Sequence, residues 1–595
     1  MTPIHLHSEP YQATGNIDAL AATKAIGRPN LSQWHVFLRE TIQNSWDARL
    51  GHSIQFSVDA HTPDESQGVA FRDFFALVPP DRAFQHSDAL SLFLDDIEEQ
   101  TVLIVSDRST RGLGGPTRAD KPVEGRTDFV DFVRNIGRDA AKTVGGGTYG
   151  FGKAILWRSS ACSTVVVHSR TYVDDHFETR LMAISLTASY NEGQRRFTGR
   201  HWWGVPDPAT GAEPLRGDAA SDWADRLGFA PFGEEETGTS LMVLGPIAEH
   251  EGQSLQDVME SLHQAVLWWC WPHLVDRTIE VSLSIEGETV EIEDPSQHRD
   301  LKEFVNAYVR VGREEVLTWP WERTEVVGRR GLGRLGKMVW RHHPEQRSDG
   351  RWRPAEWTGS HIALTRKPRF IVKYRPVPAH PDGQLTAGVF VADDQRDEDF
   401  AASEPVAHED WSPENMGKAK GEQNPVRIAL NQIDRAVISG RSAAPARVGA
   451  ENKQLGLNHL AGALGTSVGL GVDGGTRSPS GTRSRGGGGG ARRQQSLQVA
   501  PGASLSSVND TPVARFTISC RTADTAHLAL RPRLCVEGGA PDPDTAPALA
   551  SLMLDGREIT VLRDDFVEVP SGQHEITVGV VVPASGAVTV DPRWC

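Results

Sequence analysis

Between positions 34 and 47, apolar residues recur with the period of an α-helix and polar residues fall on the opposite side. The apolar side carries Trp34, Leu38, Ile42 and Trp46. On an ideal helix of about 100° per residue, Glu40, Asn44 and Asp47 lie within roughly 60° of one another. The pattern predicts a helix that buries one side and presents an acid–amide–acid row on the other. Such a row is either an ordinary solvated face or a site where a carboxylate handles a water and an amide oxygen meets a hard cation.

A second apolar run, from Thr101 to Asp107, is rich in β-branched residues and predicts a buried strand that ends in an acid. The loop that follows contains Gly112 and Gly114, which permit positive φ and a close approach of the backbone. Farther along, residues 144–153 are rich in glycine and end in Lys153. Glycines spaced in this way can turn several backbone N–H groups towards a phosphate, with a lysine beside them and a helix start behind.

In this order, the three segments resemble the ATP-binding domain of the GHKL, or Bergerat-fold, superfamily. That superfamily includes DNA gyrase, the ninety-kilodalton heat-shock chaperones, sensor histidine kinases and the mismatch-repair ATPases. Its first motif, Glu-x-x-x-Asn-x-x-Asp-Ala, is matched from Glu40 to Ala48. Its second, Asp-x-Gly-x-Gly, is matched by Asp107, Gly112 and Gly114, with extra residues after the acid that depart from the family pattern.

Two more motifs extend the resemblance over roughly residues 20–250. The family's Gly-x-x-Gly-x-Gly lid is matched by Gly147, Gly150 and Gly152. A Gly-Thr pair that opens a late strand is matched by Gly238-Thr239.

The resemblance implies an ATP and Mg²⁺ site with a role for each matched residue. Glu40 would be the general base that polarises the attacking water, and Asn44 would hold Mg²⁺ at the phosphates. Asp107 would accept the adenine amino proton, with Thr239 assisting. Further nucleotide-binding residues would be Asp47, Gly112, Gly114, Gly145, Gly146, Gly147, Thr148, Gly150, Gly152 and Lys153. For Asp47, a helix-surface acid with water-mediated contacts is an equal alternative.

Two other glycine motifs are interpreted differently. Residues Gly147 to Lys153 fit the start of a P-loop, but Ala154 stands where Ser or Thr must reach the magnesium. Residues Gly331 to Gly336 fit a dinucleotide fingerprint, but no apolar strand precedes them and basic residues surround them. We expect the first to be the lid and the second to be a flexible basic loop.

Composition shifts along the chain predict an α+β protein in four parts. Residues 1–250 would form a Bergerat-fold α/β sandwich ATPase domain. Residues 251–440 would form a transducer-like α/β domain that begins with an apolar helix and a hairpin at Gly287. Residues 441–508, rich in Gly, Ser and Arg, predict a flexible linker, and short alternating strands in 509–595 predict a small β-sandwich with a binding or assembly role.

Charged segments of the second part raise two questions. A transducer of this family sends a basic residue to the γ-phosphate, and Arg366, Lys367 and Lys373 are candidates; surface cations on a strand are the alternative. The segment from Arg329 to Arg353 holds seven arginines and one lysine, with aromatic residues among them. Cations with aromatics suit DNA phosphates and base stacking, but docking onto the acidic remainder of this protein explains the pattern equally well.

The composition of the whole chain sets limits on these expectations. The chain has 595 residues and a formal net charge of −16, which argues against a nucleic-acid binder over its whole surface. Five scattered cysteines without a Cys-x-x-Cys pair indicate reduced thiols in a cytoplasmic protein. The N-terminus lacks the apolar core of a signal peptide, and the most apolar segment, 265–274, is too short to span a bilayer. We therefore expect no membrane contact.

Two functions from different classes fit these features. The first is an ATPase that closes its lid and dimerises as a clamp, similar to the prokaryotic microrchidia-like ATPases. It would act on DNA, or on a protein partner encoded nearby, in a defence or DNA-processing system. The second is a scaffold that uses ATP only as a switch and recruits a partner through its C-terminal β domain. Glu40 separates them, because hydrolysis needs it whereas binding mainly needs Asp107 and Asn44.

Overall fold

The protein is described here from a computed structural model, in which the chain divides into two compact units, residues 1–450 and 451–595. The described residues are 4–16, 18–19, 31–84, 89–120, 123–135, 152–247, 254–313, 317–318, 320–328, 332–344, 352–354, 357–378, 380, 383–405, 408–416, 423–440, 496–499, 504–508, 511–522, 525–535, 549–558, 566–581 and 587–594. Among them, no helix is both long and apolar enough to span a bilayer.

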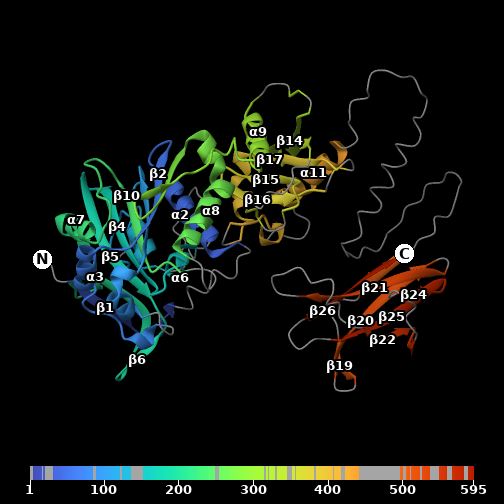
Figure 1. The fold of residues 1–595 in the computed structure, drawn as a ribbon, viewed down its shortest axis with the longest axis horizontal. Coiled ribbons are helices and arrows are strands. Elements are labelled where there is room, and N and C mark those ends of the chain that lie inside the picture. Colours follow the sequence, from blue (N-terminus) through green and yellow to red (C-terminus); the bar gives the residue numbers. More distant parts are fainter. Residues whose placement is uncertain are drawn as a thin grey trace. The chain divides into compact units, whose positions relative to one another are not determined.

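A mixed sheet forms the centre of the first unit (Figure 1). Within the described residues it has twelve strands, in the order β1-β7-β5-β4-β10-β3-β2-β11-β12, with β6 and β8 paired to β7 and β9 paired to β5. The strands are β1 (His5–Pro10), β2 (Ile54–His61), β3 (Val102–Arg108), β4 (Thr164–Val173), β5 (His176–Leu186), β6 (Tyr190–Glu192), β7 (Arg195–Asp207), β8 (Gly211–Glu213), β9 (Leu215–Arg216), β10 (Gly238–Leu244), β11 (Ile279–Ile285) and β12 (Glu288–Val290). The strand predicted to end in Asp107 is thus β3, between β10 and β2.

Helices cover both faces of this sheet, because successive residues of its central strands point to opposite sides and both sides are apolar. On one face lie α2 (Gln33–Asp47), α6 (Ile155–Arg158) and α8 (Leu255–Asp276), packed on residues such as Val105 and Val167. On the other lie α3 (Glu65–Phe74), α4 (Leu90–Asp95) and α7 (Gly217–Arg226), packed on residues such as Ile104 and Val166. The mixed class predicted from the sequence is confirmed.

Helix α8 joins this sheet to a second one. Its N-terminus is closed by a capping box between Ser254 and Asp257, and its C-terminus ends at Arg277 in the left-handed region. Three of its tryptophans, Trp268, Trp269 and Trp271, are buried, so the helix has no solvated stripe over its middle turns. The sequence predicts that the apolar helix of this region ends at about residue 269. Helix α8 instead continues to Asp276, and Leu274 and Val275 of its last turn pack against the core.

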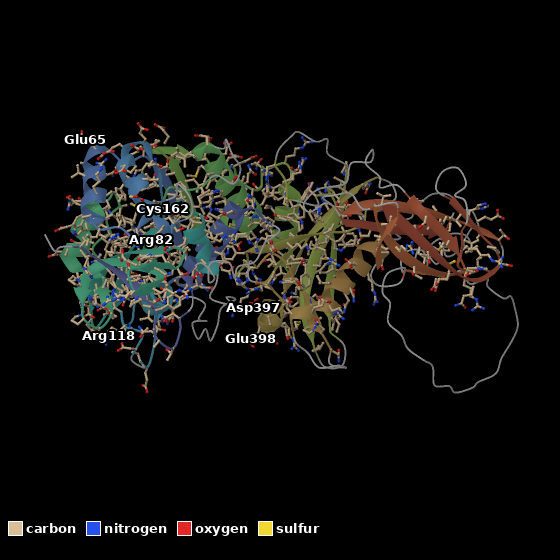
Figure 2. All side chains as sticks on the ribbon, turned by 90° about the horizontal axis from the view of Figure 1, so that it is seen from below. Glu65, Arg82, Arg118, Cys162, Asp397 and Glu398 are labelled. Carbon is tan, nitrogen blue, oxygen red and sulfur yellow. The ribbon has the colours of Figure 1, made fainter. Side chains whose placement is uncertain are left out.

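The second sheet has the order β13-β14-β17-β15-β16. Its strands are β13 (Glu322–Val327), β14 (Arg334–His343), β15 (His361–Thr365), β16 (Ile371–Pro376) and β17 (Leu385–Ala392). Helix α9 (Lys302–Val311) packs with α8 on one face, and α11 (Pro425–Gly440) packs on the other. A short helix, α10 (Asp397–Ala401), follows β17 and carries Asp397 and Glu398 at the surface of the protein (Figure 2).

The first expected domain boundary, at residue 250, does not separate the two sheets. The hairpin across Gly287 forms as predicted, from β11 and β12. However, β11 pairs in parallel with β2, so the hairpin extends the first sheet instead of opening the second. Since α8 also packs on the first sheet, the change from one sheet to the other falls after β12.

The second unit consists of two antiparallel sheets that share one core. One has the order β18-β20-β25-β22-β23 with β19 paired to β20, and the other has the order β24-β21-β26. The strands are β18 (Ser496–Val499), β19 (Ser504–Val508), β20 (Thr511–Thr522), β21 (Ala526–Cys535), β22 (Leu549–Leu554), β23 (Arg557–Glu558), β24 (Phe566–Val569), β25 (Gly572–Val581) and β26 (Ala587–Trp594). Because β18 and β19 pair with β20, the expected linker end at residue 508 is wrong, and this unit begins at or before residue 496.

Candidate functional site

The carboxylate of Asp107 is the centre of the candidate site. Its Oδ1 accepts hydrogen bonds from the Thr110 hydroxyl at 2.5 Å and from the Thr239 backbone N–H at 3.0 Å. Its Oδ2 accepts one from the Ser45 hydroxyl at 2.9 Å. The donors come from α2, from the loop after β3 and from β10, so three distant segments meet at one side chain.

The hydrogen bonding of Asp107 favours a ligand that donates a hydrogen bond. A carboxylate has about four acceptor positions, and the three described donors leave one of them on Oδ2. Burial raises the pKa of Asp107, and the hydrogen bonds from Thr110, Ser45 and Thr239 oppose that rise. A further N–H donor would favour the ionised form in the same way.

The extra residues that follow Asp107 attach the loop to the end of α2. The Ser109 carbonyl accepts from the Leu50 N–H at 3.1 Å, and the Arg111 N–H donates to the Ala48 carbonyl at 2.9 Å. This short antiparallel bridge brings Thr110 back under the carboxylate. The departure from the family spacing therefore supplies a donor to the site instead of disrupting it.

Two glycines of the site are required by backbone packing. Gly112 has a φ of +64°, and a Cβ added there would overlap the carbonyl oxygen of Arg170 and lie 3.0 Å from that of Gly238. A Cβ at Gly238 would overlap the carbonyl oxygen of Asp107. The close approach predicted for this loop is confirmed: the backbone of Gly112 lies against the carbonyl groups of Arg170 on β4 and Gly238 on β10.

The polar row of α2 differs from the expectation in its exposure. The apolar side is buried as predicted, but Glu40 is also only 9% exposed, whereas Asn44 is exposed to solvent. Asp47 is half-buried, and its backbone carbonyl accepts from the Arg111 guanidinium at 2.9 Å. The row therefore passes from a buried acid to an accessible amide along one helix.

The glycine lid is described only at its end. Gly145, Gly146, Gly147, Thr148 and Gly150 lie outside the described residues, and Gly152 and Lys153 begin a short 3₁₀ turn, η3 (Gly152–Ala154). The Lys153 ammonium donates to the backbone carbonyls of Asp131 and Asn135, at the end of α5 (Asp128–Val133). Burial lowers the pKa of Lys153 to about 8, and nearby Asp131 opposes that shift. Lys153 is expected to contact a phosphate, but in this structure its ammonium caps the C-terminus of α5.

Two of the three candidate γ-phosphate cations, Arg366 and Lys373, form ion pairs with acids of the protein. Arg366 is buried and forms ion pairs with Glu404 at 2.6 Å and Asp397 at 3.3 Å, and its contact with the γ-phosphate stays a prediction. Lys373 pairs with Asp410 at 2.6 Å. The backbone N–H of Lys367 donates to Asp397.

The described part of the basic segment, residues 332–344 and 352–353, lies mostly in β14 of the second sheet. Arg334 pairs with Asp393, Arg341 with Glu303 and Arg353 with Asp300, at 2.5, 2.5 and 2.8 Å. Trp340 is fully buried, so it has no face for a nucleic-acid base. For the described part of this segment, docking onto acids of the protein itself is the interpretation that the contacts support.

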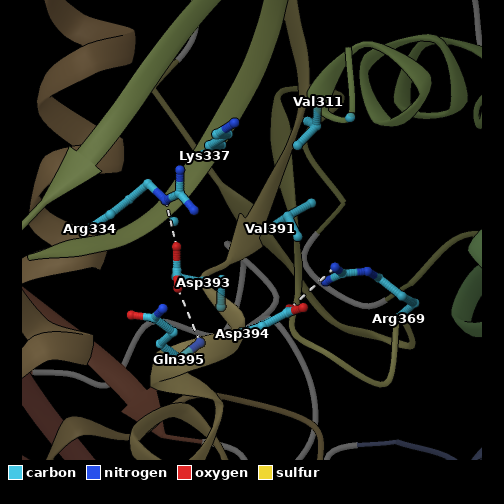
Figure 3. Close-up of a pocket in the computed structure, with 11 residues that line it drawn as sticks. Val311, Arg334, Lys337, Arg369, Val391, Asp393, Asp394 and Gln395 are labelled. Carbon is cyan, nitrogen blue, oxygen red and sulfur yellow. Dashed lines mark hydrogen bonds and ion pairs between the residues drawn. The ribbon is translucent and has the colours of Figure 1, made fainter. Parts of the chain in front are cut away.

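A cavity of about 330 Å³ lies beside this segment, between the end of α9 and the ends of β14 and β17 (Figure 3). Its three cations each have an acid close by. Arg334 pairs with Asp393, Arg369 lies 3.4 Å from Asp394, and Lys337 is opposite Glu325 on β13. The cavity lining thus holds three cations and two acids, and the third acid, Glu325, lies on the neighbouring strand.

Sequence reasoning missed three hydroxyl groups of the site. Ser45 follows Asn44 directly in the first motif and Thr110 lies among the extra residues after Asp107, so both had a signal close by. Ser169 had no such signal in the sequence. Its hydroxyl accepts from the Leu113 N–H and donates to the Gly238 carbonyl, both at 2.8 Å. These contacts form because β4, which carries Ser169, pairs with β10.

No protein-family model matches this chain, and no curated protein matches its sequence. Interpretation of the site therefore depends on its own chemistry.

Replacement of Gly112 by alanine should destabilise the protein. The left-handed backbone costs a residue with a Cβ about 1–2 kcal/mol, and overlap with the Arg170 carbonyl adds to that cost. Gly51→Ala is the matched control, because a Cβ there meets nothing within 4 Å and should change the free energy of unfolding by less than about 0.5 kcal/mol. Urea unfolding of both variants measures the difference; equal midpoints would contradict the packing described around Gly112.

Proposed function

We propose that this protein binds ATP at Asp107 and hydrolyses it with Glu40 as the general base. The observation that carries the proposal is the remaining acceptor position on Asp107, in a carboxylate held by Ser45, Thr110 and Thr239. The exocyclic amine of adenine is a donor that fits one such acceptor. The four motifs that resemble the GHKL superfamily support the same assignment.

Residues of helix α2 fit the roles proposed for them at the ATP phosphates. The Ser45 hydroxyl of this helix contacts Asp107. Asn44 is the residue before Ser45, and Glu40 lies about one helical turn closer to the N-terminus. Asn44 is exposed, so its amide oxygen is accessible to a hard cation such as Mg²⁺. When bound, Mg²⁺ would neutralise phosphate charge. Glu40, being mostly buried, has few competing waters, which suits a base that orients one water.

The clamp model adds lid closure, dimerisation and action on DNA or a partner protein. These parts follow from the resemblance and stay predictions. The alternative is the ATP-switched scaffold, which shares the Asp107 site but needs no base. The separate C-terminal unit, with its own core, gives that alternative a domain that could recruit a partner.

Asp107→Asn should weaken ATP binding by about 100-fold, because an amide N–H₂ would replace an acceptor with a donor facing the adenine amine. Asp59→Asn is the matched control: Asp59 lies in the same sheet and accepts from the Ser284 hydroxyl at 2.6 Å, but has no contact with the site. Isothermal titration with a non-hydrolysable ATP analogue measures both. Near-normal affinity in a folded Asp107→Asn protein would remove Asp107 from the binding site.

Glu40→Ala should separate hydrolysis from binding. A general base contributes about 10²–10⁴-fold to turnover but little to the affinity for an anionic triphosphate. Asn44→Ala should instead lose magnesium-dependent affinity together with rate, because the cation loses an oxygen ligand. Phosphate release and ATP titration measure the two effects. Hydrolysis at the parental rate in Glu40→Ala would place the base elsewhere, and a parental protein that binds ATP without turnover would favour the scaffold.

A further inference from the structure

Arg39, the residue before Glu40, is a buried cation that is held by backbone carbonyls. Its side chain is 6% exposed, and burial lowers its pKa. One guanidinium N–H₂ group donates to the Ile371 carbonyl at 2.8 Å, and the other donates to the His408 carbonyl. Both acceptors belong to the second sheet or to the segment that follows it, so α2 is fastened to that region by one side chain.

Two aromatic groups fix the other side of Arg39. The guanidinium lies over the Trp269 ring of α8, 5.0 Å from its centroid. The Trp269 indole N–H donates to Nδ1 of His35 at 2.9 Å, one turn before Arg39 on α2. Burial lowers the pKa of His35 to about 3, so this ring is neutral and can accept that bond. Arg39 therefore has little freedom to change rotamer without moving α2 or α8.

The carbonyl of His408 is itself fixed by a buried ion-pair network. His408 has a φ of +53°, and its ring Nδ1 lies 2.6 Å from Glu404. Glu404 also pairs with Arg366 and accepts from the Trp411 indole at 3.2 Å. Burial raises the pKa of Glu404, but Arg366 and His408 lower it to about 2, so its charge persists at neutral pH. The segment that Arg39 contacts is thus a rigid part of the second sheet region.

We propose that Arg39 is a positioning residue that transmits the state of the candidate site on α2 to the second sheet, through β16 and residues 408–411. Glu40 follows Arg39 on the same helical turn, so a shift of either one moves the other. Asp107, in contrast, is held by Ser45, Thr110 and Thr239, none of which lies in the second sheet. Replacement of Arg39 should therefore change hydrolysis, and the coupling between the candidate site and the second sheet, more than it changes recognition of adenine. This inference depends on the proposed ATP site.

Hydrogen exchange of the full chain with and without Mg-ATP tests this role. In the parental protein, Mg-ATP should slow amide exchange at residues 105–113 and also at 371–376 and 408–411. In Arg39→Met, protection at 105–113 should persist, protection in the second sheet region should fall by about 10-fold, and kcat should fall by about 10-fold with KM changed less than about threefold. Arg39→Lys keeps the charge but can reach only one of the two carbonyls, and should restore part of the coupling.

The matched control is Arg226→Met, because Arg226 also lies over a tryptophan, Trp223, at 4.1 Å, but on α7 at the opposite face of the first sheet. It should leave both regions of protection unchanged. If Arg39→Met does not fold, Arg39→Lys carries the comparison. The coupling role is overturned if protection of the second sheet stays at the parental level in Arg39→Met, or in Arg39→Lys where Arg39→Met does not fold, or if it is absent from the parent. Absence of protection at residues 105–113 in the parent overturns the ATP site as well, so the two failures are distinguishable.

Discussion

One carboxylate, that of Asp107, determines how the candidate site is assembled. Ser45, Thr110 and the Thr239 N–H all donate to it, and these donors lie on segments far apart in sequence. A buried acceptor of this kind is costly to lose, because the Thr110 hydroxyl and the Thr239 N–H would each lose the hydrogen bond described here. The position of α2 and the path of the glycine loop both depend on this side chain. Asn44 and Glu40 lie on the helix that Ser45 attaches to Asp107.

Burial connects this site to the second sheet. Helix α8 is apolar on all sides over its middle turns, so it must be covered by both sheets, and α2 lies against it. Arg39 makes a polar connection through this contact, because it donates to carbonyl groups on β16 and after α10. The proposed base and the second sheet are therefore connected through α2, the helix that also carries Ser45, one of the three donors to Asp107.

Much of the first sheet could be predicted because its signals are local. The helical spacing around Ile42, the apolar run before Asp107 and the hairpin at Gly287 each gave an element that the structure contains. The partners of these elements were harder to predict. The parallel pairing of β11 with β2, which moves the hairpin into the first sheet, has no signal in either strand.

Charged residues were the least predictable part of the chain. Arg366, Arg341 and Lys153 have the sequence context of ligand contacts, but each meets an acid or a carbonyl that the fold brings near it. A cation on a strand looks the same in sequence whether its partner is a phosphate or a distant glutamate. Arg39 was missed for the related reason that its acceptors are backbone groups more than 300 residues away.

The most direct test of the site is a comparison of ATP with ITP as ligands of the unmodified protein. Inosine carries a carbonyl oxygen where adenine has its amine, so ITP would place an acceptor against the Asp107 carboxylate. Calorimetric titration should show ATP binding at least about 100-fold more tightly than ITP, because a site built around a hydrogen-bond donor rejects an analogue that lacks it. Equal affinities for the two nucleotides would contradict recognition of adenine by Asp107.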